Sequence, residues 1–230
     1  MIDWHGHILP EMDDGSKDVN ESLAMIEKQK MQGVKISLAT PHFYANDESV
    51  ESFLKRRAES YEKLKQSLPE DAPEIILGAE VRYYQGISRL EGLKSLRIEG
   101  TKLLLLEMPM NTWTEYMIRE LVELSAKSSY RIILAHIERY YKLQKQSVWE
   151  KLNQSGILNQ SNASFFTSFT TKHKAISFLR DGLVQFIGSD CHSLTFRPPQ
   201  IDKAFEYVEK KLGAEYLSQM NEYGYSLLGK

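Results

Sequence analysis

The sequence predicts an α/β barrel, in which parallel strands alternate with helices along the chain. Short and almost continuously apolar runs recur, as expected for parallel strands that are buried on both faces. Segments in which apolar residues follow the helical spacing separate these runs. About seven runs favour a closed barrel over an open sheet, and 230 residues are enough for one such domain.

The candidate strands are the runs that lack polar interruptions, such as KISLA, EIILG, KLLLL and RIILA. Their short length and apolar character favour buried strands over amphipathic helices. We predict strands at Ile2–Trp4, Lys35–Ala39, Glu74–Gly78, Lys102–Leu106, Arg131–Ala135, Gly156–Asn159 and Val184–Ile187.

Helices are expected between the strands. Asp18 and Glu21 have the spacing of a capping box, with Asp in place of the usual Ser or Thr, and Gly33 can end that helix. Apolar residues recur at helical spacing in three later windows, which are Leu54–Leu68, Ile118–Ser125 and Ala175–Leu179.

Composition limits the classes of partner. The chain has 29 basic and 31 acidic residues, and this net charge of −2 gives no electrostatic reason to expect nucleic-acid or membrane binding. We expect no secretory leader and no membrane insertion, because the longest fully apolar run, Leu103–Leu106, is far too short. A single cysteine, Cys191, forms no intrachain disulfide, so a cytoplasmic location is expected.

Metal-capable side chains follow nearly every predicted strand. In a barrel of parallel strands, the residues at the carboxyl ends of the strands meet at one rim. Five of the six histidines lie there, whereas His173 lies in a charged helical stretch and is expected on the surface. The residues at the predicted rim include His5, His7, His42, Glu80, Glu107, His136, Asp190 and His192, with Asp13 and Asp14 in the first loop.

Such a cluster is costly without cations, because buried imidazoles and carboxylates lose hydration that only a partner can replace. In an extended His5-Gly6-His7 segment, both imidazoles point to the same side of the strand. Imidazoles combined with carboxylates suit Mn²⁺, Fe²⁺ or Zn²⁺. About nine ligands exceed the needs of one ion, so two or three ions are expected.

The sequence resembles the polymerase and histidinol phosphatase (PHP) superfamily, and within it the bacterial manganese-dependent tyrosine phosphatases of capsule and exopolysaccharide synthesis. The segments MIDWHGHILPEMDDG, ATPH, GAE, LLEMP, AHIERY and GSDCH carry the resemblance, in order along the chain. The resemblance implies a distorted (β/α)7 barrel with a trinuclear metal site, and a single PHP-type metallophosphatase domain over residues 1–230.

By the same resemblance, Arg139 and Arg197 bind the phosphate. The chain departs from the common pattern at Glu11, Ile137 and Cys191, and Glu11 adds a charge near the rim that could alter substrate access. The implied metal ligands are His5, His7, Asp14, His42, Glu80, Glu107, His136, Asp190 and His192.

The resemblance implies a metal-dependent phosphomonoesterase, in which a metal-bound hydroxide attacks phosphotyrosine. Mn²⁺ is the expected metal, with Fe or Zn as alternatives. The expected partner is a tyrosine-phosphorylated protein, namely a bacterial tyrosine kinase of polysaccharide synthesis. Alternatives are a PHP phosphatase for a small phosphoester such as histidinol phosphate, a PHP phosphodiesterase or nuclease, and a non-catalytic, metal-stabilised regulator that binds the kinase.

Cys191 and Arg197 also match the C-x5-R spacing of cysteine-based tyrosine phosphatases. The five residues between them contain no glycine, and Pro198 and Pro199 remove amide donors where a phosphate would need them. We therefore interpret this match as coincidental and expect Cys191 to pack behind the ligands. Three aromatic residues near the rim, Tyr44, Trp113 and Tyr140, could equally stack on a substrate phenol or pack within the fold.

Overall fold

Seven parallel strands form at or near the positions that the sequence predicts. The structure is a computed structural model that describes residues 1–230. Each predicted strand is found, with its ends displaced by no more than a few residues. The strands are β1 (Ile2–Gly6), β2 (Ile36–Ala39), β4 (Glu74–Leu77), β6 (Leu103–Glu107), β7 (Arg131–Leu134), β8 (Leu158–Asn162) and β9 (Phe186–Gly188).

Two further short strands, β3 (His42–Phe43) and β5 (Glu80–Arg82), continue the paths of β2 and β4 after brief interruptions. Backbone bonds from Gly78 N to Ala39 O (2.8 Å) and from Glu80 N to Pro41 O (2.9 Å) bridge those interruptions. The sheet β1-β2-β4 therefore runs on into the sheet β3-β5-β6-β7-β8-β9, and every pairing is parallel.

The first and last strands close the ring. A parallel bridge joins Gly6 to Cys191. His7 N donates to Cys191 O (2.9 Å), and Asp190 N donates to His5 O (2.8 Å). Gly188 permits this approach, because a Cβ there would lie 2.6 Å from His5 Cβ. The seven strand paths thus make a distorted barrel, which confirms the expected fold class.

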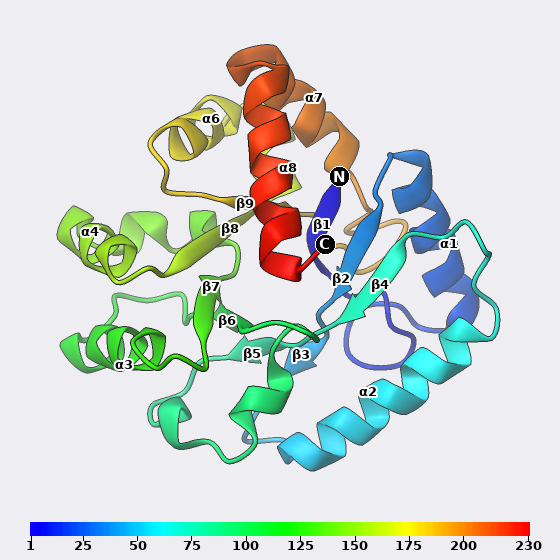
Figure 1. Ribbon diagram of the computed structural model, residues 1–230, viewed down its shortest axis with the longest axis horizontal. Helices are drawn as coiled ribbons and strands as arrows, with labels where there is room; N and C mark the ends of the chain where they lie inside the picture. Colours follow the sequence, from blue (N-terminus) through cyan, green and yellow to red (C-terminus); the bar gives the residue numbers. More distant parts are fainter.

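Helices lie around the outside of the ring of strands (Figure 1). The first begins where the sequence predicts, since the Asp18 side chain accepts a bond from Glu21 N (2.9 Å). The α-helices are α1 (Val19–Met31), α2 (Val50–Lys65), α3 (Glu115–Ser125), α4 (Gln146–Gln154), α5 (Ala163–Thr167), α6 (Lys172–Arg180), α7 (Ile201–Leu212) and α8 (Ala214–Leu228). Short 3-10 helices span Ile87–Arg89, Leu93–Leu96, Ile137–Arg139 and Tyr141–Leu143, and no helix is both long and apolar enough to cross a membrane.

The last helix, α8, packs across the barrel beside the amino ends of the strands. In Figure 1 it lies beside β1, with the two chain termini close together. A Cβ at Gly224 would lie 3.0 Å from both Ile2 and Trp4, so the absent side chain allows this close packing. Tyr223 and Leu227 of the same helix pack against the inner core. One end of the barrel is therefore apolar and covered.

Apolar residues fill both sides of the sheet, as the continuous apolar runs predict. Thirteen buried residues form the inner cluster, among them Ile36, Leu105 and Phe186. Forty-six more form the layer between strands and helices. Because each face of every strand is covered, polar side chains are left to gather at the rim.

A β-bulge in β1 re-aims the first candidate ligand. Asp3 pairs with Ser37 and Gly6 pairs with Ala39, so two residues of β1 stand opposite one residue of β2. The extra residue interrupts the regular alternation of side chains along β1. Trp4 packs in the inner core, and the next residue, His5, reaches the rim.

The buried carboxylate of Glu120 holds the loop after β5 in place through hydrogen bonds. Glu120 on α3 accepts bonds from Tyr83 Oη (2.8 Å), Gly86 N (3.1 Å), Ser88 N (3.2 Å) and Ser88 Oγ (2.8 Å). Burial alone would raise the pKa of Glu120, but these donors lower it overall. The loop that leaves the rim at Arg82 is therefore held in a defined position.

Candidate metal centre

Every one of the nine residues predicted as ligands reaches the same rim of the barrel. His5 lies in β1, His42 begins β3, Glu80 begins β5 and Glu107 ends β6. The other five lie in the segments that follow strands. They are His7 and Asp14 after β1, His136 after β7, and Asp190 and His192 after β9.

The nine side chains form four overlapping groups, in each of which the candidate ligand atoms lie within 4.8 Å of one another. Four residues belong to two groups each, so the groups adjoin and share side chains. Such sharing is the geometry in which neighbouring ions are bridged by common ligands. The groups are His7, Asp14, His42 and His192; His5, His7 and Asp190; His5, Glu80 and His136; and His42, Glu80 and Glu107.

His5 and His7 direct their Nε2 atoms toward each other, at a separation of 3.1 Å. Both nitrogens also approach Glu80 Oε2, at 3.2 and 3.4 Å respectively. Burial lowers the pKa of each imidazole, but the surrounding carboxylates, including Asp190, raise both pKa values overall. The cluster therefore attracts positive charge strongly, as a cation site must.

Several buried atoms of the cluster lack a hydrogen-bond partner. Glu80 Oε2, His42 Nδ1 and His192 Nε2 are all in this state. Glu80 Oε2 lies 2.9 Å from His42 Nδ1 without the alignment of a hydrogen bond. Buried ligand atoms that lie close together without a satisfied hydrogen bond need a further partner, and a divalent ion would supply it. Burial, reinforced by the charge of His7, lowers the pKa of His192 to about 4, so this imidazole is a neutral donor at pH 7. The residues present thus fit divalent ions.

Two candidate ligands have a left-handed backbone, which is rare for residues other than glycine. The φ angles are 34° at His136 and 51° at Asp190. Each amide is held by an acceptor. His136 N donates to Gln160 Oε1 (2.8 Å), and Asp190 N donates to His5 O. Such conformations persist where the surroundings fix them, and they are common at functional sites.

Asp13 supports the centre without joining a ligand group. Its Oδ2 accepts from His7 Nδ1 (2.6 Å) and from His42 N (2.8 Å), and its Oδ1 accepts from Gly15 N (2.9 Å). Burial would raise the pKa of Asp13, but the His7 contact lowers it overall. A proton held at Nδ1 leaves Nε2 of His7 free to face the cluster. The sequence shows two adjacent aspartates here, but nothing in it assigned this role to the first.

Strand β8 brings no candidate ligand, yet it supports three of them through amide side chains. Gln160 Oε1 holds His136 N and lies 3.4 Å from His5 Nδ1. Gln160 Nε2 donates to Asn162 Oδ1 (3.0 Å), and Asn162 Nδ2 donates to Asp190 Oδ2 (2.7 Å). Neither residue was predicted from the sequence, because an amide side chain lacks the imidazole or carboxylate that marks a candidate ligand.

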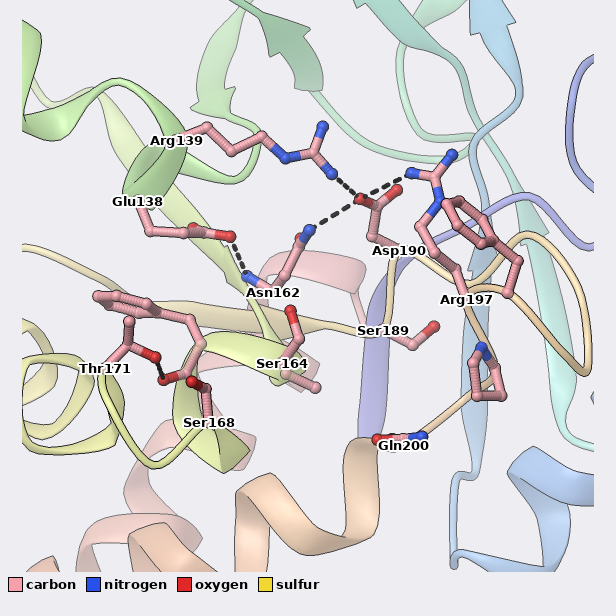
Figure 2. Close-up of a pocket in the computed structure, with 14 residues that line it drawn as sticks. Glu138, Arg139, Asn162, Ser164, Ser168, Thr171, Ser189, Asp190, Arg197 and Gln200 are labelled. Carbon is pink, nitrogen blue, oxygen red and sulfur yellow. Dashed lines mark hydrogen bonds and ion pairs between the residues drawn. The ribbon is translucent and has the colours of Figure 1, made fainter.

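The two predicted arginines converge on one oxygen atom. Arg139 and Arg197 both donate to Asp190 Oδ2, as Figure 2 shows. Arg197 also reaches Asp14 Oδ2 at 3.3 Å. Each arginine side chain is about one-third exposed, so both remain accessible from solvent. A third arginine, Arg82, was not predicted as part of the site; it lies 3.2 Å from Glu107 Oε2 and is half exposed.

Glu11, which could have altered substrate access, points away from the cluster. Its Oε2 pairs with Lys63 Nζ of α2 at 3.0 Å. Its φ of 59° is in the left-handed region, where glycine is favoured. His173 is exposed beside Tyr207 and belongs to none of the four ligand groups.

The cysteine and the three rim aromatic residues have mostly structural surroundings. Cys191 is fully buried, and burial raises the pKa of its thiol to about 12. A thiol in this state is a poor nucleophile, which argues against the cysteine-based mechanism. Trp113 and Tyr140 are also buried, whereas Tyr44 is half-buried and stacks against His42. Of these three aromatic residues, only Tyr44 is accessible enough to contact a ligand bound at the metal centre.

A barrel of parallel strands with clustered imidazoles and carboxylates at its carboxyl rim defines a metal-dependent α/β-barrel protein. The family model for capsular polysaccharide synthesis proteins CpsB/CapC matches residues 1–223. The chain belongs to this family.

Named relatives and a solved structure agree with the family match. The chain is 32% identical to the tyrosine-protein phosphatase CpsB of Streptococcus agalactiae serotype III, over 96% of this chain and 94% of that protein. It is 30% identical to the tyrosine-protein phosphatase YwqE of Bacillus subtilis, over 96% and 89%. A crystal structure from work on YwqE and on Streptococcus pneumoniae CpsB, described as metal-dependent tyrosine phosphatases, matches with a TM-score of 0.82 and 26% identity, over 99% and 94% of the two chains.

Proposed function

We propose that this chain is a metal-dependent protein-tyrosine phosphatase of capsule or exopolysaccharide synthesis. The observation that carries the proposal is the convergence of nine metal-capable side chains at one rim of the barrel, beside two arginines that both donate to Asp190. A hydrolytic metal site beside two phosphate-binding cations suits phosphomonoesters. The names of the CpsB and YwqE relatives support phosphotyrosine as the substrate.

The four ligand groups support two or three ions, and we propose Mn²⁺ as the resident metal, with Fe or Zn as alternatives. The nine residues named above would hold the ions. A bound divalent ion supplies a Lewis acid and a source of hydroxide at neutral pH. Because these ligands extend from His5 to His192, we also propose that residues 1–230 act as one metallophosphatase domain.

Arg139 and Arg197 are assigned to the phosphoryl oxygens. Their guanidinium groups approach one carboxylate oxygen of Asp190 from two directions, which places two cationic donors at one edge of the cluster (Figure 2). A planar guanidinium can bond two oxygens at once and neutralise the charge that develops during transfer. The leaving phenolate has a pKa of about 10, so its departure needs little protonation at neutral pH.

We propose that the substrate is a tyrosine-phosphorylated protein, namely the tyrosine kinase that serves the same polysaccharide synthesis. The family description links the relatives to capsular polysaccharide synthesis and supports this partner. Since tyrosine phosphorylation consumes ATP, we place the reaction in the cytoplasm.

The test compares three substrates in one preparation: a phosphotyrosine peptide, histidinol phosphate and single-stranded DNA. Manganese should support rapid hydrolysis of the peptide, and EDTA should abolish it. Arg139→Ala should lower kcat/KM about 100-fold, the cost of removing one transition-state donor. Arg119→Ala is the matched control, because Arg119 is exposed on α3 and contacts Tyr116 and Glu123 of the same helix, away from the metal centre.

Three results would contradict the proposal. Hydrolysis that persists in EDTA would exclude a metal mechanism. Preference for histidinol phosphate would make the chain a small-molecule phosphatase. Metal-dependent thermal stability with background turnover would favour the non-catalytic regulator.

A further inference from the structure

A pocket of about 490 Å³ opens beside the candidate metal centre. It shares Arg139, Asp190 and Arg197 with the centre, and it extends from them between two segments of chain, 162–171 and 189–200 (Figure 2). This volume lies in the range of sites that bind whole ligands. A phosphoryl group held by the two arginines would leave most of the pocket empty.

The polar groups that line the pocket suit an uncharged partner with many hydrogen-bonding groups. Asp190 and the two arginines belong to the metal centre and the phosphate site, and Glu138 is the one other charged residue of the lining, so the rest of the pocket is lined mainly by neutral groups. Short hydroxyl and amide side chains can both donate and accept, as main-chain amides require. The side chains of Ser164 and Gln200 make no hydrogen bond within the protein and are free to bind a partner. The neutral polar residues of the lining are Asn162, Ser164, Ser168, Thr171, Ser189 and Gln200.

Exposed apolar side chains lie on the same two segments. Phe196 is 83% exposed and lines the pocket, and Phe169, in the other segment, is 85% exposed. With Leu194, these segments carry three of the six exposed large hydrophobic residues of the chain. Exposed apolar side chains on the two segments that form a pocket are typical of a surface that a partner covers.

We propose that this pocket binds the polypeptide main chain next to the phosphotyrosine of a protein substrate, while apolar side chains of that substrate cover Phe169 and Phe196. The inference rests on the proposed function, and it adds that the enzyme binds the peptide main chain as well as the phosphate. Continuity with Arg139 and Arg197 supports this occupant, because a peptide whose phosphate lies on the arginines must leave the centre along one of its walls.

The experiment compares kcat/KM for a phosphotyrosine heptapeptide with kcat/KM for p-nitrophenyl phosphate, which has no peptide. Ser164 is exposed on α5 and faces the pocket, so Ser164→Trp should fill it. We expect the peptide to p-nitrophenyl phosphate ratio to fall about tenfold, the effect of losing one well-placed contact region. Ser164→Ala should keep the ratio near that of the wild type.

Two further variants guard against a folding defect. Phe196→Ala removes a side chain that contributes little to the core, and it should lower the ratio about threefold to tenfold. Ser67→Trp, at an exposed position after α2, is the matched control and should not change the ratio.

The outcomes separate the two proposals. If the wild-type enzyme with manganese hydrolyses neither substrate, the proposed function fails, and the pocket assignment fails with it. If it hydrolyses both, and if Ser164→Trp and Phe196→Ala change both rates equally, only the pocket assignment is overturned.

Discussion

Replacing Asp13 with asparagine should weaken manganese binding, although Asp13 belongs to no ligand group. One carboxylate serves three donors, because Oδ2 accepts from His7 Nδ1 and His42 N, while Oδ1 accepts from Gly15 N. An asparagine has only one acceptor oxygen in the same place. Its amide group must therefore face either the donors of His7 and His42 or the amide of Gly15.

The structure sets the size of this effect. The bond between Asp13 and His7 is short, buried and charge-assisted, at 2.6 Å. Losing such a bond costs about 1.5–3 kcal/mol. At about 1.4 kcal/mol per factor of ten, this corresponds to a rise in the manganese Kd of roughly 10- to 100-fold.

The assay is the manganese dependence of turnover, with isothermal titration calorimetry as an independent measure of Kd. Asp13→Asn should shift half-saturation to higher manganese and recover most of its turnover at saturation. Asp47→Asn, at an exposed loop position, is the matched control. Wild-type manganese affinity in Asp13→Asn would refute the positioning role, as would a loss of turnover that saturating manganese does not restore.

Three other predictions concern chemistry and stability. Cys191→Ser should retain turnover, and iodoacetamide should not inactivate the wild type, because the thiol is buried and its pKa is raised; alkylation-sensitive turnover would contradict this. Glu120→Ala should lower the free energy of unfolding by about 3 kcal/mol in urea titrations at pH 7, because it leaves Tyr83 Oη and three other donors without an acceptor. The folded-state pKa of Glu120 is lowered, so its contribution is complete above the unfolded pKa of about 4.3 and is lost at lower pH; a deficit that does not shrink below about pH 4 would refute this. The pKa values of His5 and His7 are raised above the ordinary histidine value of about 6.5, so manganese should displace protons and bind more tightly as pH rises above that value. Calorimetry in two buffers of different ionisation enthalpy would detect the proton release; equal binding enthalpies in the two buffers would contradict it.

The apolar runs allowed the strands to be predicted from sequence. Runs such as Arg131–Ala135 have no polar face, so only a strand covered on both sides explains them. Because the strands are parallel, their carboxyl ends had to share one rim, and this rule alone brought His5 and His192 together. Whether these residues hold metal ions stays a prediction.

The features that escaped prediction depend on three-dimensional pairing. The strands β3 and β5 are too short to show periodicity, and they exist because His42 and Phe43 pair with Glu80 and Val81 of the adjacent strand. The bulge at Trp4 and His5 depends on the register with β2, which one strand does not encode by itself. Gln160 is an ordinary polar residue in sequence, and only the fold places its amide beside His136.

The junction between β1 and β9 has a consequence for biosynthesis. His5 leaves the ribosome before its neighbour Asp190 and before His192, which lies beside His7, because both follow after most of the barrel has been translated. A nascent chain therefore carries its earliest imidazoles without the groups that complete their surroundings. Metal capture should then be a late step of maturation, coupled to the arrival of the final strand, and a fragment that ends before β9 should be unable to retain ions.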